Sequence, residues 1–139
     1  MTLQNTDQVA LGGTTGTFKK VQSLPGNMVA GLAVVSKSDG TYTNTLSDGA
    51  LVGVSLGQDE SNTGKVFAVC REGSGVPILA GTLTPVIGAQ VQIHATSGKA
   101  VDSGTAVNAV IVSGLLDAVL EDGTISVDGC ILIDMVGGL

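Results

Sequence analysis

The chain has 139 residues, enough for one domain with a hydrophobic core of modest size. Apolar residues make up 43% of the sequence, but Trp is absent, Tyr occurs once and Phe twice, so the core must be aliphatic. The formal net charge is −6 and the six basic residues are scattered. This argues against a nucleic-acid partner, because binding to phosphates needs a concentrated basic surface.

Charged residues are scarce, at 13% of the chain, compared with about 25% in an average soluble domain. A surface with so little charge leaves apolar area available for protein contacts. We therefore expect subunit contacts that bury this area, with an unusually apolar monomer as the alternative. Glycine interrupts the apolar runs, which are too short for a membrane helix. Met1–Asp7 lacks the basic and apolar parts of a signal peptide, so we expect synthesis in the cytoplasm.

The first part of the chain differs from the rest. It is rich in Thr, Gln, Asn and Gly and has little apolar periodicity, a composition typical of a segment that does not fold alone. We expect residues 1–26 to be an arm laid across a neighbouring subunit, with Val9, Leu11 and Phe18 as its partner-binding residues. An arm held by its own domain is the alternative. Residues 27–139 are then the β domain.

Glycines and β-branched residues predict short strands joined by tight turns. Val29–Ser36 is predicted as a strand that ends in a hairpin turn at Ser38–Gly40, because Asp-Gly tolerates the positive φ of a type I′ turn. A second turn at Ser47–Gly49 leads into a strand at Leu51–Leu56. Gly53, inside this strand, indicates a bulge or a close backbone contact.

The middle of the chain predicts the centre of the sheet. Lys65–Arg71 contains a run that is apolar on both faces, which favours a strand covered on both sides. Gly73–Gly75 predicts a turn into a separate strand at Val76–Ala80. Pro77 has no N–H, so this second strand is expected at an edge or a bulge.

The next strand, Val91–Ala95, has the clearest alternation in the chain. It predicts Val91, Ile93 and Ala95 on the inner face and Gln92 and His94 on the outer face.

The sequence pattern in the last third of the chain is less definite. Ala106–Val112 is typical of a strand, whereas Leu115–Glu121 fits either a strand or a short helical turn. Ser126–Val136 predicts a long, strongly apolar final strand. The chain as a whole is predicted to be all-β, a compact antiparallel β-barrel or β-sandwich of short strands with an extended N-terminal arm.

Catalysis needs a positioned nucleophile, base or metal cluster, and the sequence indicates none. His94 is the one histidine and is predicted to face solvent. Cys70 and Cys130 lie in apolar strands without a further Cys or His at metal-ligand spacing. Both are predicted to be small core residues, and a disulfide between them stays open.

Two further patterns are not expected to form binding sites. Gly12–Gly16 is rich in glycine but lacks the Lys-Ser/Thr of a phosphate-binding loop. A group of acidic residues lacks the order of a calcium-binding loop, so solvated turns are preferred over a metal site; the group is Asp117, Glu121, Asp122 and Asp128. We therefore expect no enzyme activity, no cofactor and no metal.

A series of glycine-punctuated strands extends through the first two thirds of the chain. It consists of Ser47–Leu56, Lys65–Cys70 followed by Gly75–Ile78, and Gly88–Ile93 followed by Ser97–Lys99. This order resembles that of the small capsid cement, or decoration, proteins of tailed bacteriophages.

The resemblance covers roughly residues 26 to 102 and implies a β-barrel or β-sandwich subunit, often trimeric, on the outer capsid surface of the virion. The implied partners are the major capsid protein and further copies of the chain, with no nucleic acid and no membrane. The implied function is to bind between capsomers and stabilise the mature lattice. The alternative is a trimeric fibre or adhesin domain that binds a host surface or a glycan, for which Tyr42 alone supplies little aromatic surface.

Overall fold

A computed structural model describes residues 8–10, 17–22, 29–58, 66–120, 123–136 and 139, with the backbone alone for 8–10, 17–22, 57–58 and 66–68. The strands in chain order are β1 (Gln8–Ala10), β2 (Thr17–Gln22), β3 (Ala33–Lys37), β4 (Tyr42–Thr43), β5 (Gly49–Gln58), β6 (Val66–Leu79), β7 (Gln90–Ile93), β8 (Thr105–Ile111), β9 (Asp117–Val119) and β10 (Cys130–Met135). A single 3-10 turn, η1 (Leu46–Asp48), is the one helical element in these residues. The predicted all-β fold is confirmed.

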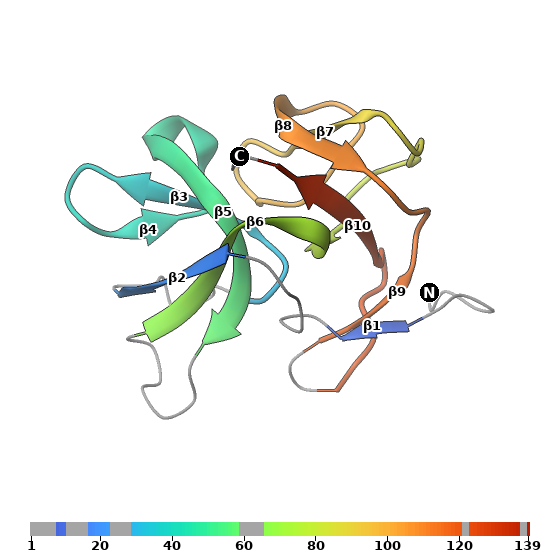
Figure 1. Cartoon of the computed structure of the whole chain (residues 1–139), viewed down its shortest axis with the longest axis horizontal. Helices are drawn as coiled ribbons and strands as arrows, with labels where there is room; N and C mark the ends of the chain where they lie inside the picture. Colours follow the sequence, from blue (N-terminus) through green and yellow to red (C-terminus); the bar gives the residue numbers. More distant parts are fainter. Residues whose placement is uncertain (1–7, 11–16, 23–28, 59–65, 121–122, 137–138) are drawn as a thin grey trace.

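One large sheet has the strand order β4-β3-β5-β6-β10-β8-β7, with β2 paired to β6 outside this path. Its strand pairs are antiparallel. β1 and β9 form a separate two-stranded parallel sheet. The large sheet is strongly curved, with β2 to β5 on one side and β7, β8 and β10 on the other (Figure 1). This curvature agrees with the predicted antiparallel barrel or sandwich.

β6 connects the two halves of the sheet, since it pairs with β5 and β2 along its first half and with β10 along its second. The prediction of a central strand is confirmed, but the predicted turn at Gly73–Gly75 is wrong. The chain continues there as a bulge, in which Gly75 has a φ of +65° and the register with β10 shifts between Ile133 and Met135. The bulge stays within the sheet because the N–H of Gly75 donates to Oδ1 of Asp134 at 2.8 Å.

Pro77 fits into β6 because its missing N–H is not needed for pairing. Its partner across the sheet is Leu132 on β10. Leu132 uses its own backbone groups on the other side, where its N–H donates to Ser113 Oγ at 2.8 Å and its carbonyl accepts from Val112 at 3.0 Å. The Leu132–Pro77 pair therefore has no hydrogen bonds across it, as expected of a strand position next to a bulge.

The structure resolves one element prediction that was left open and corrects two others. Leu115–Glu121 contains strand β9, because its backbone pairs with β1. Ser126–Val136 is a strand only from Cys130 onward, since Gly129 has a φ of +76° and breaks the extended conformation. Ala95 is exposed, because β7 ends at Ile93 and a turn follows.

The prediction for Gly53 is confirmed. Val34 pairs with Gly53 but Val35 pairs with Leu51, so β5 has one extra residue at this point. On the other side of β5, a Cβ on residue 53 would lie 2.9 Å from the carbonyl carbon of Cys70 and closer still to its oxygen. β5 and β6 can approach this closely because Gly has no side chain.

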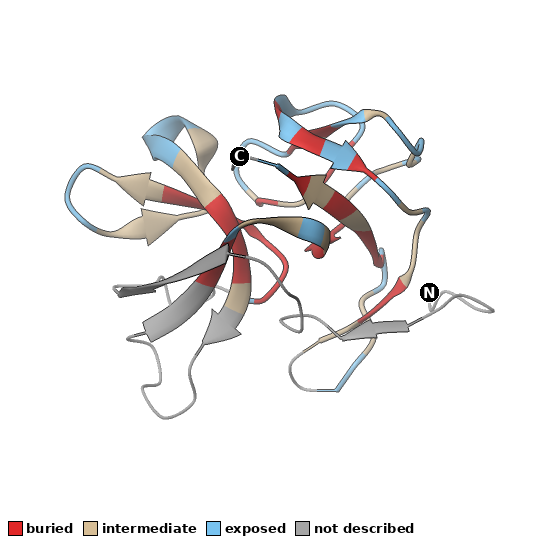
Figure 2. Ribbon diagram, viewed as in Figure 1, coloured by how far each residue is buried: buried red, intermediate tan, exposed pale blue. Residues whose placement is uncertain are grey.

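The core is aliphatic, as the composition predicts, and occupies the concave side of the sheet (Figure 2). Strands from both halves contribute fully buried side chains, among them Ala33, Val54, Ile78, Val91, Ile93, Ile131 and Ile133. Cys70 and Cys130 are buried and free, which confirms their core position and shows no disulfide.

The segment predicted to be an arm contributes β1 and β2. β1 pairs with β9 and β2 pairs with β6, both in the same chain. In the single chain, these strands therefore adopt the alternative arrangement, in which the N-terminal segment is held by its own domain.

Candidate interaction surface

The outward face of β8 and β10 is a largely apolar surface. β8 alternates between buried and exposed residues (Figure 2). Val110 lies opposite Asp134 in the register of the two strands, and the N–H of Val112 donates to the Leu132 carbonyl at 3.0 Å. We call this surface the β8–β10 face; it comprises Asn108, Val110, Val112, Leu132, Asp134 and Val136.

The valines of the β8–β10 face are unusually exposed for large apolar side chains. The exposed fractions are 42% for Val110, 37% for Val112 and 78% for Val136. The side-chain amide of Asn108 donates to the carbonyl of Val136 at 3.3 Å, which ties the end of β10 to β8. The valines are thus presented by a hydrogen-bonded sheet.

The loop before β7 carries two further exposed apolar side chains. Val86 is 62% exposed and Ile87 is 68% exposed. The loop is fixed beside the end of β8 because Gly88 N–H donates to the carbonyl of Ile111 at 2.8 Å and Ile111 N–H donates to that of Ala89 at 2.9 Å. The loop that carries these two exposed apolar side chains is therefore held beside the end of β8.

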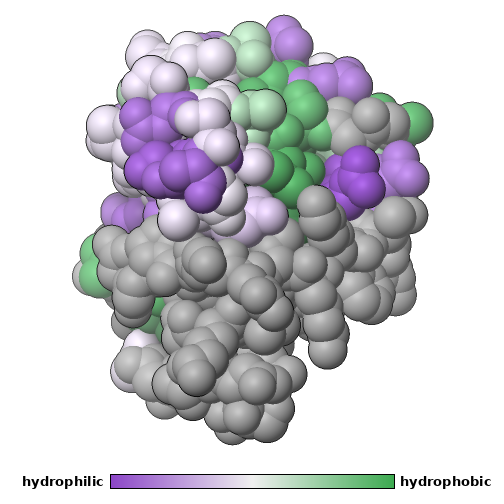
Figure 3. All heavy atoms as spheres, turned by 90° about the vertical axis from the view of Figure 1, so that its left-hand side faces the viewer, coloured by the Kyte–Doolittle hydropathy of each residue, from purple (hydrophilic) through white to green (hydrophobic). Residues whose placement is uncertain are grey.

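The β8–β10 face contains one charged residue, Asp134, and one oxygen of its carboxylate is bound to the backbone of Gly75. Charged side chains occur elsewhere, for example Lys37 and Asp39 at the β3–β4 hairpin. The side of the molecule that carries this hairpin shows a group of hydrophilic residues beside a strip of hydrophobic ones (Figure 3). The β8–β10 face is suited to a flat contact with another apolar protein surface.

Such a face can bind without any catalytic group. Burying one large aliphatic side chain completely contributes about 1.5–3 kcal/mol. Several of them are needed, since association costs at least about 4 kcal/mol in lost translation and rotation. The β8–β10 face provides Val110, Val112 and Val136 for this purpose.

The predicted partner-binding residues of the arm fall on or between the two N-terminal strands. Val9 lies in β1 opposite Ala118, and Phe18 lies in β2 opposite Cys70. Leu11 lies outside the described residues. The structure brings Val9 and Phe18 onto different sheets, and neither belongs to the β8–β10 face.

Sequence analysis predicted the strand at Ala106–Val112 but did not recognise its outer face as a binding surface. The signal was present, because Ala106, Val110 and Val112 are apolar at alternate positions while Val107 and Ile111 also need burial. A strand with apolar residues on both faces is normally covered on both sides; where one side is not covered, its apolar residues are exposed to solvent. The tertiary structure exposes one.

The structure describes only some of the residues that were considered, and set aside, as binding-site candidates. Asp117 and Asp128 are described, whereas Glu121, Asp122 and the glycine-rich segment Gly12–Gly16 lie outside the described residues. Within the described part of the chain, no group of three or more His, Cys, Asp or Glu residues could hold a metal ion.

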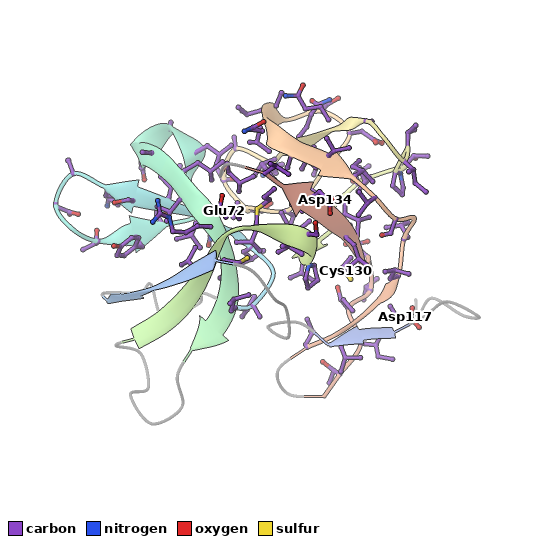
Figure 4. The ribbon with its side chains drawn as sticks, viewed as in Figure 1. Glu72, Asp117, Cys130 and Asp134 are labelled. Atoms are coloured by element: carbon purple, nitrogen blue, oxygen red, sulfur yellow. The ribbon has the colours of Figure 1, made fainter. Side chains whose placement is uncertain are left out.

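Cys130 belongs to the second, smaller core cluster, and Asp117 on β9 is a buried carboxylate; both are labelled in Figure 4. Asp117 is 4% exposed, and its Oδ1 has no hydrogen-bond partner. Burial, followed by the negative charge of Asp117, raises the pKa of the Cys130 thiol to about 11. A thiol with so high a pKa is a poor nucleophile at neutral pH, in keeping with a structural cysteine.

His94 is exposed, as predicted. Its Nδ1 accepts the backbone N–H groups of Thr96 and Ser97, each at 3.2 Å. Nδ1 is thereby occupied by the turn that follows β7.

The described residues contain no helix with the length and hydropathy needed to cross a membrane.

Comparisons with protein-family models, with curated proteins and with solved structures each find no match for this chain.

Proposed function

We propose that this chain is a non-enzymatic structural protein, a cement protein that binds the outer surface of a tailed-bacteriophage capsid between capsomers. In this proposal the protein acts as a homotrimer, its other partner is the major capsid protein, and its location is the virion after synthesis in the host cytoplasm. The observation that carries the proposal is the exposed, nearly uncharged β8–β10 face on a chain with few charges.

The proposed mechanism is mechanical. A protein that binds the mature lattice and not its precursor or dissociated subunits stabilises that lattice by mass action. A trimer that contacts several capsomers at once gains further affinity through avidity, so that each contact can be weak.

The β8–β10 face is assigned to the contact between copies of the chain. Each copy has a net charge of −6, so two copies repel one another. An interface with almost no charge of its own avoids adding repulsion at short range and draws on apolar burial. The N-terminal residues Val9, Leu11 and Phe18 are assigned to the capsid. Since β1 pairs only with β9 and β2 only with β6 among the described strands, a capsid strand would add to the other edge of β1 or β2.

Light scattering after size-exclusion chromatography tests the homotrimer. Val110→Asp places a charge in the β8–β10 face, whereas Val127→Asp places the same charge on a residue that is 60% exposed in the loop before β10. We expect the unmodified chain and Val127→Asp to be trimeric and Val110→Asp to dissociate to monomers. A trimer that persists in Val110→Asp would remove the assignment of this face.

Co-sedimentation with phage particles tests whether the chain binds to the capsid. The chain should sediment with mature heads that contain the major capsid protein and should raise the temperature at which these heads release DNA. Stable monomers that never associate with particles would refute the proposed function.

A further inference from the structure

An open hollow of about 370 Å³ lies at the end of β7, and none of the residues of the β8–β10 face lines it. Two segments form it, the loop after β6 and the segment between β7 and β8. The polar side chains that line it are Thr82, His94, Ser97, Lys99, Asp102 and Ser103. Its volume lies within the range of small-molecule sites, about 300–1,000 Å³.

Backbone hydrogen bonds hold the two walls together. Gly81 N–H donates to the carbonyl of Ala100 at 2.8 Å, and Asp102 N–H donates to that of Thr82 at 2.9 Å. The N–H of Thr84 donates to Oδ1 of Asp102 at 2.9 Å. The hollow is therefore pre-formed, and its second Asp102 oxygen remains as an acceptor.

The hydrogen bonds between His94 and the turn after β7 determine the tautomer of the neutral His94 ring. Nδ1 of His94 accepts from the N–H groups of Thr96 and Ser97, so in the neutral ring the proton is on Nε2. Nε2 lies on the opposite edge of the ring from this turn and is available as a donor.

The other donors are also unused in the described part of the chain. Neither the ammonium of Lys99 nor the hydroxyl of Thr82 or Ser103 has a side-chain partner there. Lys99 and Asp102 line the same hollow without forming an ion pair with each other. The hollow thus combines one cation and several neutral donors with one carboxylate acceptor.

We propose that this hollow binds a monosaccharide that carries a carboxylate, of the hexuronic acid class. The sugar carboxylate would pair with Lys99 and Nε2 of His94, because a charge-assisted pair with a second donor is strong and directional. Hydroxyls of the sugar would donate to the free oxygen of Asp102 and exchange hydrogen bonds with Thr82 and Ser103.

The Asp102 carboxylate distinguishes this ligand from a simple anion. A bare oxyanion has no hydroxyl to donate to Asp102, so nothing offsets the repulsion between the two negative charges. A neutral sugar would leave Lys99 without a counter-charge. A ligand with both a carboxylate and vicinal hydroxyls satisfies every group, and this inference does not depend on which protein covers the β8–β10 face.

Saturation-transfer NMR and calorimetry with glucuronate test the site, with glucose and acetate as partial ligands. We expect millimolar binding of glucuronate and much weaker binding of either partial ligand. Lys99→Gln should weaken glucuronate binding about tenfold, the effect of losing one charge-assisted hydrogen bond. Lys37→Gln, on the β3–β4 hairpin, is the matched control and should bind normally.

The sign of the Asp102→Asn effect decides between the ligand classes. Asn keeps an oxygen for the N–H of Thr84, so the wall stays in place. Binding of glucuronate should weaken severalfold, because the carboxylate that accepts from the sugar hydroxyls is lost. Stronger binding in this variant would show that the hollow prefers a simple anion and would overturn the proposal.

His94→Asn tests the second donor. Its side-chain oxygen can still accept from the turn amides, but the Nε2–H is absent. We expect severalfold weaker glucuronate binding with unchanged thermal stability. No detectable binding of glucuronate to the unmodified protein, or equal binding to Lys99→Gln, would refute the site.

Discussion

Replacing Gly53 by Ala tests whether the close approach of β5 and β6 is needed by the fold. The new Cβ would lie 2.9 Å from the carbonyl carbon of Cys70, closer still to its oxygen, and 2.9 Å from a methyl of Val69. Real Cβ atoms do not approach closer than 3.0 Å. The obstacle is mainly backbone, so a change of rotamer cannot relieve it.

The cost can be estimated from what must move. Shifting the two strands apart by about 1 Å stretches the neighbouring ladder hydrogen bonds beyond their useful length. Losing two of them costs about 2 kcal/mol, and loosening the packing of Val54 and Val69 adds about 1–2 kcal/mol. The total of about 3–4 kcal/mol is a large part of the 5–15 kcal/mol that typically stabilises a domain.

Gly114→Ala is the matched control, because a Cβ there meets no atom within 4 Å. Urea unfolding followed by far-UV circular dichroism suits a chain without Trp. We expect Gly53→Ala to lose about 3–4 kcal/mol and Gly114→Ala to stay within about 0.5 kcal/mol of the unmodified protein. If the two variants unfold at the same urea concentration, the reasoning about the β5–β6 contact is wrong.

Three further predictions concern buried or partly buried polar groups. Ser55→Ala should cost about 1–3 kcal/mol in urea unfolding, because it removes the acceptor for the buried N–H of Leu32 at 3.1 Å; an unchanged midpoint would contradict this. Asp134→Ala should lose about 1–2 kcal/mol by freeing the N–H of Gly75 in the β6 bulge, whereas Asp134→Asn keeps an acceptor and should lose less; equal losses would count against the bond. Because burial raises the pKa of Cys130 from 9.0 to about 11, the unfolded chain loses this proton first. Stability should therefore fall between pH 9 and pH 11, by about 1–2 kcal/mol after allowance for solvent screening, and Cys130→Ala should show a smaller fall when unfolding is measured at pH 8 and pH 11.

Local sequence patterns were sufficient for the strands whose two faces differ clearly. Val91 and Ile93 are buried and His94 is exposed, as their alternation predicts. The same reasoning identified the central strand and the buried cysteines. It was wrong at Gly73–Gly75, because two glycines close together are typical of both a turn and a bulge.

The two candidate surfaces needed the tertiary structure for different reasons. The β8–β10 face depends on the register that sets Val110 opposite Asp134. The hollow at the end of β7 depends on the loop after β6 meeting the segment after β7, which brings Thr82 next to Asp102. No local pattern specifies either of these contacts.

The sequence by itself determined the fold class, the aliphatic core and the scarcity of surface charge, since these follow from composition and from a two-residue period. The tertiary structure alone decided the path of β6 through its bulge, where Gly75 is bound by Asp134, 59 positions further along the chain. It also decided which apolar faces are covered and which stay exposed. The physical reason is that burial and pairing depend on neighbours distant in sequence, whereas periodicity reports only the alternation within one strand.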